Sequence, residues 1–270
     1  MAKNVTRIDG ICRERMYLVE GERRAALVDS GSGFGSLRAV VEKLTKKPII
    51  LLLTHGHVDH AMGAAEFDKV FMSPLDKAVF DLHGEKKFRL DDLTFSRERD
   101  AVTEDDYIPT ADPSRFCDLS EGDVFDLGGV VLEAYACPGH TPGSMVFLDR
   151  GRRTLYSGDA FSNFTFLIGP MALSVEEYAQ SLRSLRDKIR GTYDRVFESH
   201  GTGELPPTIL SNVLTVCKEL MDGKTDRVSY EFRDLHGFLA KARQPHSLRR
   251  VDGGTGNLIY DENKIWREKL

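Results

Sequence analysis

The segment Thr54-His55-Gly56-His57-Val58-Asp59-His60 places three imidazoles and one carboxylate within six positions. It directly follows Ile49–Leu53, a continuous apolar run whose length predicts a strand buried on both faces. Histidine and aspartate at this density can supply two neighbouring metal sites, and a strand end holds such side chains rigidly. The segment therefore predicts a metal site at the end of a buried strand.

The rest of the chain predicts a layered α/β protein. Residues 36–44 carry apolar side chains at the spacing of one helix face, and Ser174 with Glu177 forms the capping-box pattern that starts a helix. A second amphipathic helix is predicted over 208–220. Short apolar runs separated by glycine turns predict strands; these runs are Met16–Val19, Ala25–Val28, Val124–Leu127, Val130–Tyr135, Ser144–Leu148, Arg153–Tyr156, Val196–Phe197 and Asn257–Tyr260.

Three further residues of the metal-ligating type each follow a predicted strand. His140 lies in Cys137-Pro138-Gly139-His140, Asp159 ends Leu155–Asp159, and His200 lies in Ser199-His200-Gly201. Each is weak evidence alone, but strand ends on one edge of an α/β sheet face a common crevice. We therefore expect these three residues to share a site with the histidine-rich segment.

Taken together, these motifs resemble those of the metallo-β-lactamase-fold hydrolase superfamily, in the branch of glyoxalase II and the lactonases. The resemblance rests on THGHVDH at 54–60, PGHTPGS at 138–144, SGD at 157–159, SHG at 199–201 and LVDSG at 27–31. It implies an α/β protein with the αββα four-layer sandwich. We expect a single domain over residues 1–270, with a charged, partly helical insertion at about 73–118 that is either a lid or a solvated surface excursion.

The resemblance also implies two divalent metal ions and their ligands. The first ion takes His55, His57 and His140; the second takes Asp59, His60 and His200; Asp159 bridges them. Asp29 is implied to support the site without binding metal. A mixed imidazole and carboxylate set suits zinc, and iron or manganese also fit.

The expected activity is hydrolysis of a small ester, thioester or lactone. Two divalent cations lower the pKa of a shared water, which gives a metal-bridging hydroxide at neutral pH. Asp59 is the predicted catalytic residue, because its carboxylate can orient the nucleophile and later handle its proton. The alternatives are a phosphodiesterase, an iron-dependent redox enzyme with the same ligands, and a catalytically silent binding module.

Phe161, Phe164 and Phe166 follow Asp159 closely and predict an apolar, substrate-binding wall for an acyl or aromatic group. The alternative is ordinary core packing. The three remaining histidines, His83, His236 and His246, match no motif and are expected at the surface or in packing contacts.

Composition sets the remaining expectations. The chain has 270 residues, 41% hydrophobic and 29% charged, which excludes collagen-like and disordered classes. A net charge of -5 gives no reason to expect a nucleic-acid partner, so the expected partner is a small-molecule substrate. No apolar run approaches the roughly 18 to 20 residues of a membrane span. Four cysteines without a CxxC pair favour a reducing compartment, and we expect the cytoplasm.

Overall fold

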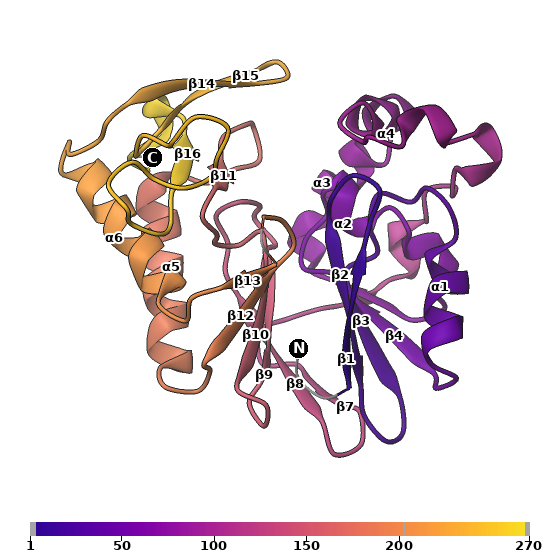
Figure 1. Ribbon diagram of the computed structural model, residues 1–270. Coiled ribbons are helices and arrows are strands. Elements are labelled where there is room, and N and C mark those ends of the chain that lie inside the picture. Colours follow the sequence, from indigo (N-terminus) through magenta and orange to yellow (C-terminus); the bar gives the residue numbers. More distant parts are fainter. Residues whose placement is uncertain (1–3, 202, 268–270) are drawn as a thin grey trace. The chain divides into compact units, whose positions relative to one another are not determined.

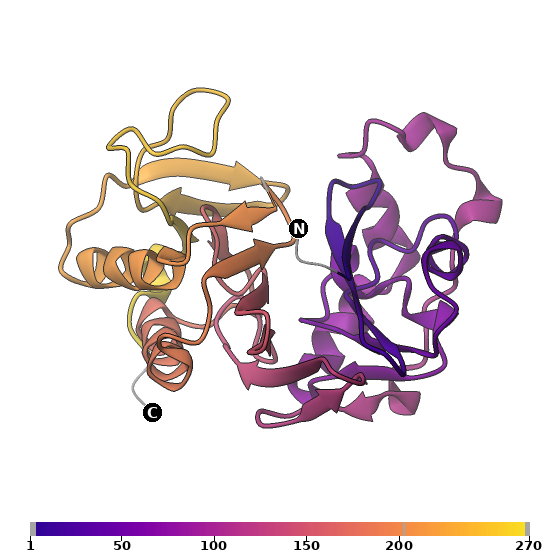
Figure 2. The same cartoon turned by 60° about the horizontal axis from the view of Figure 1, so that its bottom comes forward.

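Strand β4 (Ile49–Leu52) forms from the predicted apolar run and lies at the centre of a six-stranded sheet. The computed structural model describes residues 4–201 and 203–267, in two units. The first unit runs to Tyr135 and includes Phe147–Arg152; the second comprises Ala136–Val146 and the chain from Arg153 onward. Figures 1 and 2 show the elements of each unit.

The sheet of the first unit has the strand order β1-β2-β3-β4-β5-β6. Its other strands are β1 (Val5–Asp9), β2 (Arg15–Glu20), β3 (Ala25–Val28), β5 (Val70–Met72) and β6 (Cys117–Asp118). Strands β1 to β3 pair antiparallel, whereas β3 to β6 pair parallel. Parallel strands end at the same edge of a sheet. Consequently, Asp29 after β3 and the segment Thr54–His60 after β4 lie at one edge.

Two short helices of the first unit follow strands β3 and β4 in the chain. Helix α1 (Leu37–Leu44) starts after Ser36, whose side chain accepts a hydrogen bond from the Ala39 amide, and Val41 on its inner face is buried in the core. Helix α2 (Val58–Ala61) is a single turn after His57, followed by the short turn η1 (Ala64–Glu66). Strands β7 (Val124–Asp126) and β8 (Val131–Ala136) form an antiparallel hairpin, and β9 (Met145–Asp149) follows.

The segment predicted as an insertion is partly helical. It contains α3 (Lys77–His83), α4 (Lys86–Leu93) and four short turns, η2 (Pro74–Asp76), η3 (Arg99–Ala101), η4 (Glu104–Asp106) and η5 (Pro113–Arg115). Arg89 of α4 is fully buried and donates hydrogen bonds to the carbonyls of Gly33 and Ile108, both at 2.6 Å. Its guanidinium also lies 4.0 Å from the centre of the Tyr107 ring. These contacts fasten the segment to the loop after β3.

In the second unit, β10 (Thr154–Gly158) and β12 (Arg195–Glu198) pair parallel, and β13 (Glu204–Leu205) pairs antiparallel with β12. Helix α5 (Val175–Ile189) begins with the predicted capping box of Ser174 and Glu177. Figure 1 shows α5 beside α6 (Ile209–Met221). The parallel pair places the residues that follow β10 and β12 at one edge.

A second sheet in this unit has the order β11-β16-β15-β14, with β11 (Thr165–Leu167), β16 (Leu258–Tyr260), β15 (Leu235–Leu239) and β14 (Val228–Phe232). The sequence predicted only β16 of these four strands. The short turn η6 (Glu262–Lys264) follows β16. Across the described part of the chain, no helix is long and apolar enough to cross a membrane.

Candidate metal centre

The histidine-rich segment leaves β4 and enters α2 with its imidazoles close together. His55 and His60 are 1% and 0% exposed, while the Asp59 side chain is 22% exposed. Nε2 of His55 lies 3.1 Å from Nδ1 of His57, and the His55 and His60 ring centres are 4.0 Å apart. Nε2 of His60 lies 3.6 Å from a carboxylate oxygen of Asp59. The first unit thus gathers four of the predicted ligands around one point.

Asp29 fixes the orientation of two of these imidazoles. It is buried, and its carboxylate accepts hydrogen bonds from the Thr54 amide (2.7 Å), the Thr54 hydroxyl (2.9 Å) and Nδ1 of His60 (2.8 Å). The Thr54 hydroxyl in turn lies 3.0 Å from Nδ1 of His55. Because the hydroxyl donates to Asp29, it accepts from His55. Both histidines therefore carry a proton on Nδ1 and present the Nε2 lone pair.

Two residues that the sequence analysis did not single out as site residues also hold this segment. A carboxylate oxygen of Asp76, which is 0% exposed, accepts a hydrogen bond from the Gly56 amide at 2.8 Å. Nδ1 of His83 accepts from the Val58 amide at 3.2 Å, and its ring stacks on His57 with centres 4.4 Å apart. His83 was expected at the surface or in a packing contact. No motif marks it, since it reaches His57 from α3, 26 positions along the chain.

The second unit gathers the other three predicted ligands. Asp159 follows β10 and His200 follows β12, so the parallel pairing brings them together. A carboxylate oxygen of Asp159 lies 3.3 Å from Nε2 of His200 and 4.0 Å from Nε2 of His140. Nδ1 of His140 donates to the Phe166 carbonyl at 2.6 Å, so its Nε2 carries the lone pair.

Helix α5 supports this second group through Tyr178. The Tyr178 hydroxyl donates to the carbonyl of Ala160, the residue after Asp159, at 2.6 Å. A Cβ added at Gly139, the residue before His140, would lie 2.1 Å from the Tyr178 ring. Glycine is therefore required at position 139, where it lets the His140 loop pack against the helix.

The donors of each unit fit divalent metal ions. Ligand atoms of His55 and His57, and of His55 and His60, lie within 4.8 Å of one another. Zn–N bonds of about 2.0–2.1 Å place two nitrogens of one tetrahedral ion roughly 3.3 Å apart, close to the spacing between His55 and His57. Buried imidazoles that turn lone pairs toward one another repel unless they share a proton or a cation. Neutral imidazole and carboxylate are the donors that zinc, iron and manganese accept.

The three phenylalanines after Asp159 have different surroundings. Phe161 is fully buried. Phe164 and Phe166 are partly exposed and form edge-to-face contacts with two residues of β14, Tyr230 and Phe232. We call Phe164, Phe166, Tyr230 and Phe232 the aromatic wall. It adjoins His140, since the Phe166 carbonyl binds that imidazole.

Comparison with known proteins agrees with these features. A family model described as the metallo-beta-lactamase superfamily matches residues 10–201. The chain is 27% identical to an acyl-coenzyme A thioesterase, MBLAC2, from Gallus gallus over 206 residues, covering 70% of this chain and 72% of that protein. It is 27% identical to the hydroxyacylglutathione hydrolase GloC from Haemophilus influenzae over 184 residues, covering 68% of this chain and 82% of that protein.

Solved structures show the same fold. A metallo-beta-lactamase superfamily protein from Sulfolobus tokodaii aligns with a TM-score of 0.58 and 18% identity, covering 86% of this chain and 91% of that chain. The sec-alkylsulfatase Pisa1 from Pseudomonas sp. aligns with a TM-score of 0.65 and 15% identity, covering 83% of this chain and 42% of that chain. At such identities the likeness concerns the fold alone.

Proposed function

This chain belongs to the metallo-beta-lactamase superfamily, as its motifs predict, and from that premise we propose that it is a dinuclear metal-dependent hydrolase of small thioesters and related esters or lactones. Its sequence relatives, an acyl-coenzyme A thioesterase and a hydroxyacylglutathione hydrolase, indicate a hydrolase and favour a thioester among the three substrate classes. We expect the enzyme to act in the cytoplasm.

The proposed ligands are those that the sequence predicts. His55, His57 and His140 hold one ion, Asp59, His60 and His200 hold the other, and Asp159 bridges the two. The observation that carries this proposal is the buried histidine cluster of the first unit, in which Asp29 and Thr54 fix two Nε2 lone pairs. The matching arrangement of Asp159, His140 and His200 in the second unit supports it.

When bound, two divalent ions supply Lewis acidity, which lowers the pKa of a water and polarises the substrate carbonyl. Zinc suits the donor set, and iron or manganese would also serve. The protein contributes by holding the metal-ligating side chains rigidly in place before a metal ion binds. The buried Asp29 carboxylate does so for His60 directly and for His55 through Thr54.

Asp59 is the proposed catalytic acid–base residue. Its side chain is 22% exposed, so one carboxylate oxygen can reach a water while the other faces His60. The carboxylate accepts a proton from the attacking water as the oxygen–carbonyl bond forms. It returns that proton to the departing sulfur or oxygen as the bond to the acyl carbon breaks.

The aromatic wall is the proposed binding surface for the acyl group. Phe166, Ile259 and Leu239 are register partners across three strands, so their side chains share one face of the sheet. Tyr230 and Phe232 lie on the same face of β14, through their partners Gly237 and Leu235. This face carries aromatic rings that are only partly buried, beside His140. Phe161 is fully buried, so Phe164 and Phe166 carry the proposed contact.

The test is a substrate panel on the purified, metal-loaded protein. It contains an acyl-coenzyme A, a glutathione thioester, a lactone, an aryl ester and a bis-aryl phosphodiester. We expect the fastest turnover on a thioester and loss of turnover in Asp59→Asn. His236→Ala, which changes a 75% exposed histidine of β15, is the matched control. Turnover on the phosphodiester alone, or on nothing, would overturn the proposal.

A further inference from the structure

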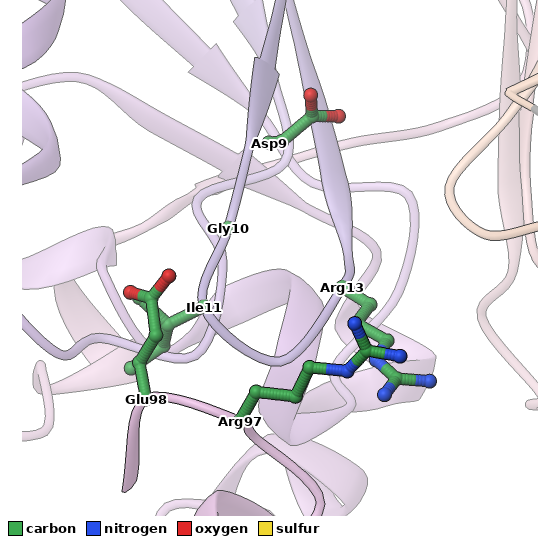
Figure 3. Close-up of a pocket in the computed structure, with 6 residues that line it drawn as sticks. All are labelled: Asp9, Gly10, Ile11, Arg13, Arg97 and Glu98. Atoms are coloured by element: carbon green, nitrogen blue, oxygen red, sulfur yellow. The ribbon is translucent and has the colours of Figure 1, made fainter. Parts of the chain in front are cut away.

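A pocket lies at the turn between β1 and β2, where part of the charged segment 73–118 meets it (Figure 3). Its volume is about 530 Å³, within the range of small-molecule sites. Six residues line it, namely Asp9, Gly10, Ile11, Arg13, Arg97 and Glu98. All belong to the first unit. We call this cavity the arginine pocket, because two guanidinium groups dominate one side of it.

Arg13 and Arg97 come from different parts of the chain and extend toward the same side of the pocket in Figure 3. Within residues 4–201 and 203–267, neither guanidinium has a hydrogen bond or an ion pair to a carboxylate. Asp9, in contrast, is paired with Arg7 (3.0 Å) and Arg15 (3.4 Å). Glu98 lies on the other side of the pocket from the two guanidiniums. Besides these two guanidiniums, the carboxylates of Asp9 and Glu98 line the pocket, and the buried Glu14 lies in the same turn.

The turn that carries Arg13 is a fixed element. Its ends are joined by hydrogen bonds from the Gly10 amide to the Glu14 carbonyl (2.8 Å) and from the Arg13 amide to the Gly10 carbonyl (3.3 Å). Arg13 has φ of 70°, a left-handed conformation that glycine or asparagine adopts more easily. Ser96, next to Arg97, donates its hydroxyl to the Ile11 carbonyl at 2.7 Å. The backbone segments that carry the two arginines are therefore held close to each other.

Hydrogen bonds connect the same turn to the histidine-rich segment. The buried Glu14 carboxylate accepts from the amide (3.0 Å) and hydroxyl (2.8 Å) of Ser32. In the same loop, the Ser30 amide donates to the His60 carbonyl at 2.6 Å, and the Met62 amide donates to the Gly31 carbonyl at 3.0 Å. Burial raises the pKa of the Cys12 thiol in this turn, and the charges of Glu14, Asp92 and Asp59 add to that rise. The arginine pocket and the predicted ligands of the first unit are thus neighbours.

We infer that the arginine pocket binds a phosphate group on the thiol part of the thioester substrate. This inference rests on the proposed function. A guanidinium presents parallel N–H donors that match phosphate oxygens, and two such groups suit a dianion better than a carboxylate, which one arginine satisfies. A volume of about 530 Å³ exceeds the need of an inorganic phosphate and leaves room for an attached sugar. The substrate class is therefore a thioester whose thiol part carries a phosphate, as coenzyme A does.

The kinetic test compares two thioesters that share one acyl group, a coenzyme A thioester and the uncharged N-acetylcysteamine thioester. In the double variant Arg13→Ala/Arg97→Ala, we expect KM for the coenzyme A thioester to rise at least tenfold with kcat nearly unchanged. Turnover of the uncharged thioester should not change. Arg115→Ala, an exposed arginine of η5 outside the pocket, is the matched control. A similar KM change for both thioesters, or for neither, would overturn the inference.

A glutathione thioester, whose anionic groups are carboxylates, identifies the ligand chemistry. If the double variant raises its KM as strongly as that of the coenzyme A thioester, the pocket binds anions in general and the assignment to phosphate is wrong.

A binding measurement separates this inference from the proposed hydrolysis. Coenzyme A is titrated calorimetrically into the full chain, with no turnover required. We expect the double variant to weaken coenzyme A binding at least tenfold and Arg115→Ala to leave it unchanged. Equal binding by wild type and double variant would refute the pocket assignment even if hydrolysis is found. Loss of binding in the double variant, with no thioester hydrolysed by wild type, would refute the proposed function alone.

Discussion

Nδ1 of His60 donates a hydrogen bond to Asp29 at 2.8 Å, and both side chains are 1% exposed. The pair joins the ends of two parallel strands, since Asp29 follows β3 and His60 lies in the turn of helix after β4. A buried carboxylate that accepts from an imidazole fixes which ring nitrogen presents its lone pair. Asp29 therefore orients the imidazole of His60 for metal binding, although Asp29 is not itself one of the proposed ligands.

The variant Asp29→Asn tests whether the Asp29 carboxylate orients the His60 imidazole for metal binding. Asparagine tolerates the left-handed backbone of Asp29, whose φ is 63°, so the change removes the charge and keeps the chain conformation. We expect zinc affinity to fall about 10- to 100-fold, as for other partners of metal-binding histidines. Competition with a chromogenic chelator measures the affinity. Unaltered affinity in Asp29→Asn would show that the carboxylate only packs.

His83 is expected to position His57 through its ring stacking and to hold the start of α2 through Nδ1. His83→Phe keeps an aromatic ring but loses the acceptor for the Val58 amide, and His83→Ala loses both. A buried amide left without an acceptor costs about 1–3 kcal/mol. We expect both variants to unfold at lower urea concentration, with activity falling further in His83→Ala than in His83→Phe. Equal activity in the two variants would exclude the stacking role.

Arg89 is expected to be a large contributor to the stability of the first unit. Its removal leaves the Ile108 carbonyl without its guanidinium donor, whereas the Gly33 carbonyl keeps the Ile108 amide as a donor at 3.0 Å. At about 1–3 kcal/mol for an unsatisfied buried group, we expect Arg89→Met to lower the free energy of unfolding by about 1–3 kcal/mol. Urea unfolding measures the change, and Lys87→Met on the exposed side of α4 is the matched control. A loss no greater than that of the control would contradict the prediction.

The aromatic wall predicts a preference for bulky acyl groups. Phe166→Ala keeps the backbone carbonyl that binds His140, so its effect should fall on substrate binding. We expect kcat/KM to fall roughly tenfold for a medium-chain or aromatic thioester, equivalent to about 1.4 kcal/mol. The acetyl thioester should change much less. Phe238→Ala, on the opposite face of the same sheet, should leave this preference intact. A uniform loss across acyl lengths would argue against an acyl-binding wall.

Cysteine reactivity provides an independent check of the fold. Burial raises the pKa of Cys137 to about 12 and also raises the pKa of Cys217, so both thiols stay protonated at pH 8 and do not react as thiolates. Cys117 is exposed, and all four cysteines are free. Mass spectrometry after brief iodoacetamide treatment should find Cys117 labelled and Cys137 and Cys217 unlabelled. Labelling of the latter two before unfolding would contradict their burial.

Local patterns predicted much of the fold. The apolar run at 49–53 became β4, the helix pattern at 36–44 became α1, and the capping box of Ser174 and Glu177 starts α5. These elements depend on neighbours within a few positions, which a sequence displays directly. The α/β class and the superfamily are confirmed by the family match and by the structural neighbours. The ligand assignment, the single domain and the lid remain predictions.

Other features arise from contacts between distant residues, which no local pattern marks. Strands β14 and β15 were missed, and with them the contribution of Tyr230 and Phe232 to the aromatic wall. Arg89 lies in the segment predicted only as charged, yet it is fully buried and binds the carbonyl of Gly33, 56 positions away. His83 matched no motif because its partner His57 lies on another element.

The metal content of the purified protein, measured together with thioester hydrolysis, tests the central claim most directly. We predict about two metal ions per chain, loss of activity on chelation and recovery on adding zinc. His57→Ala and Asp159→Ala should lower both metal content and activity, whereas His236→Ala should change neither. Fewer than one metal ion per chain, with no hydrolysis after zinc is added, would contradict the account.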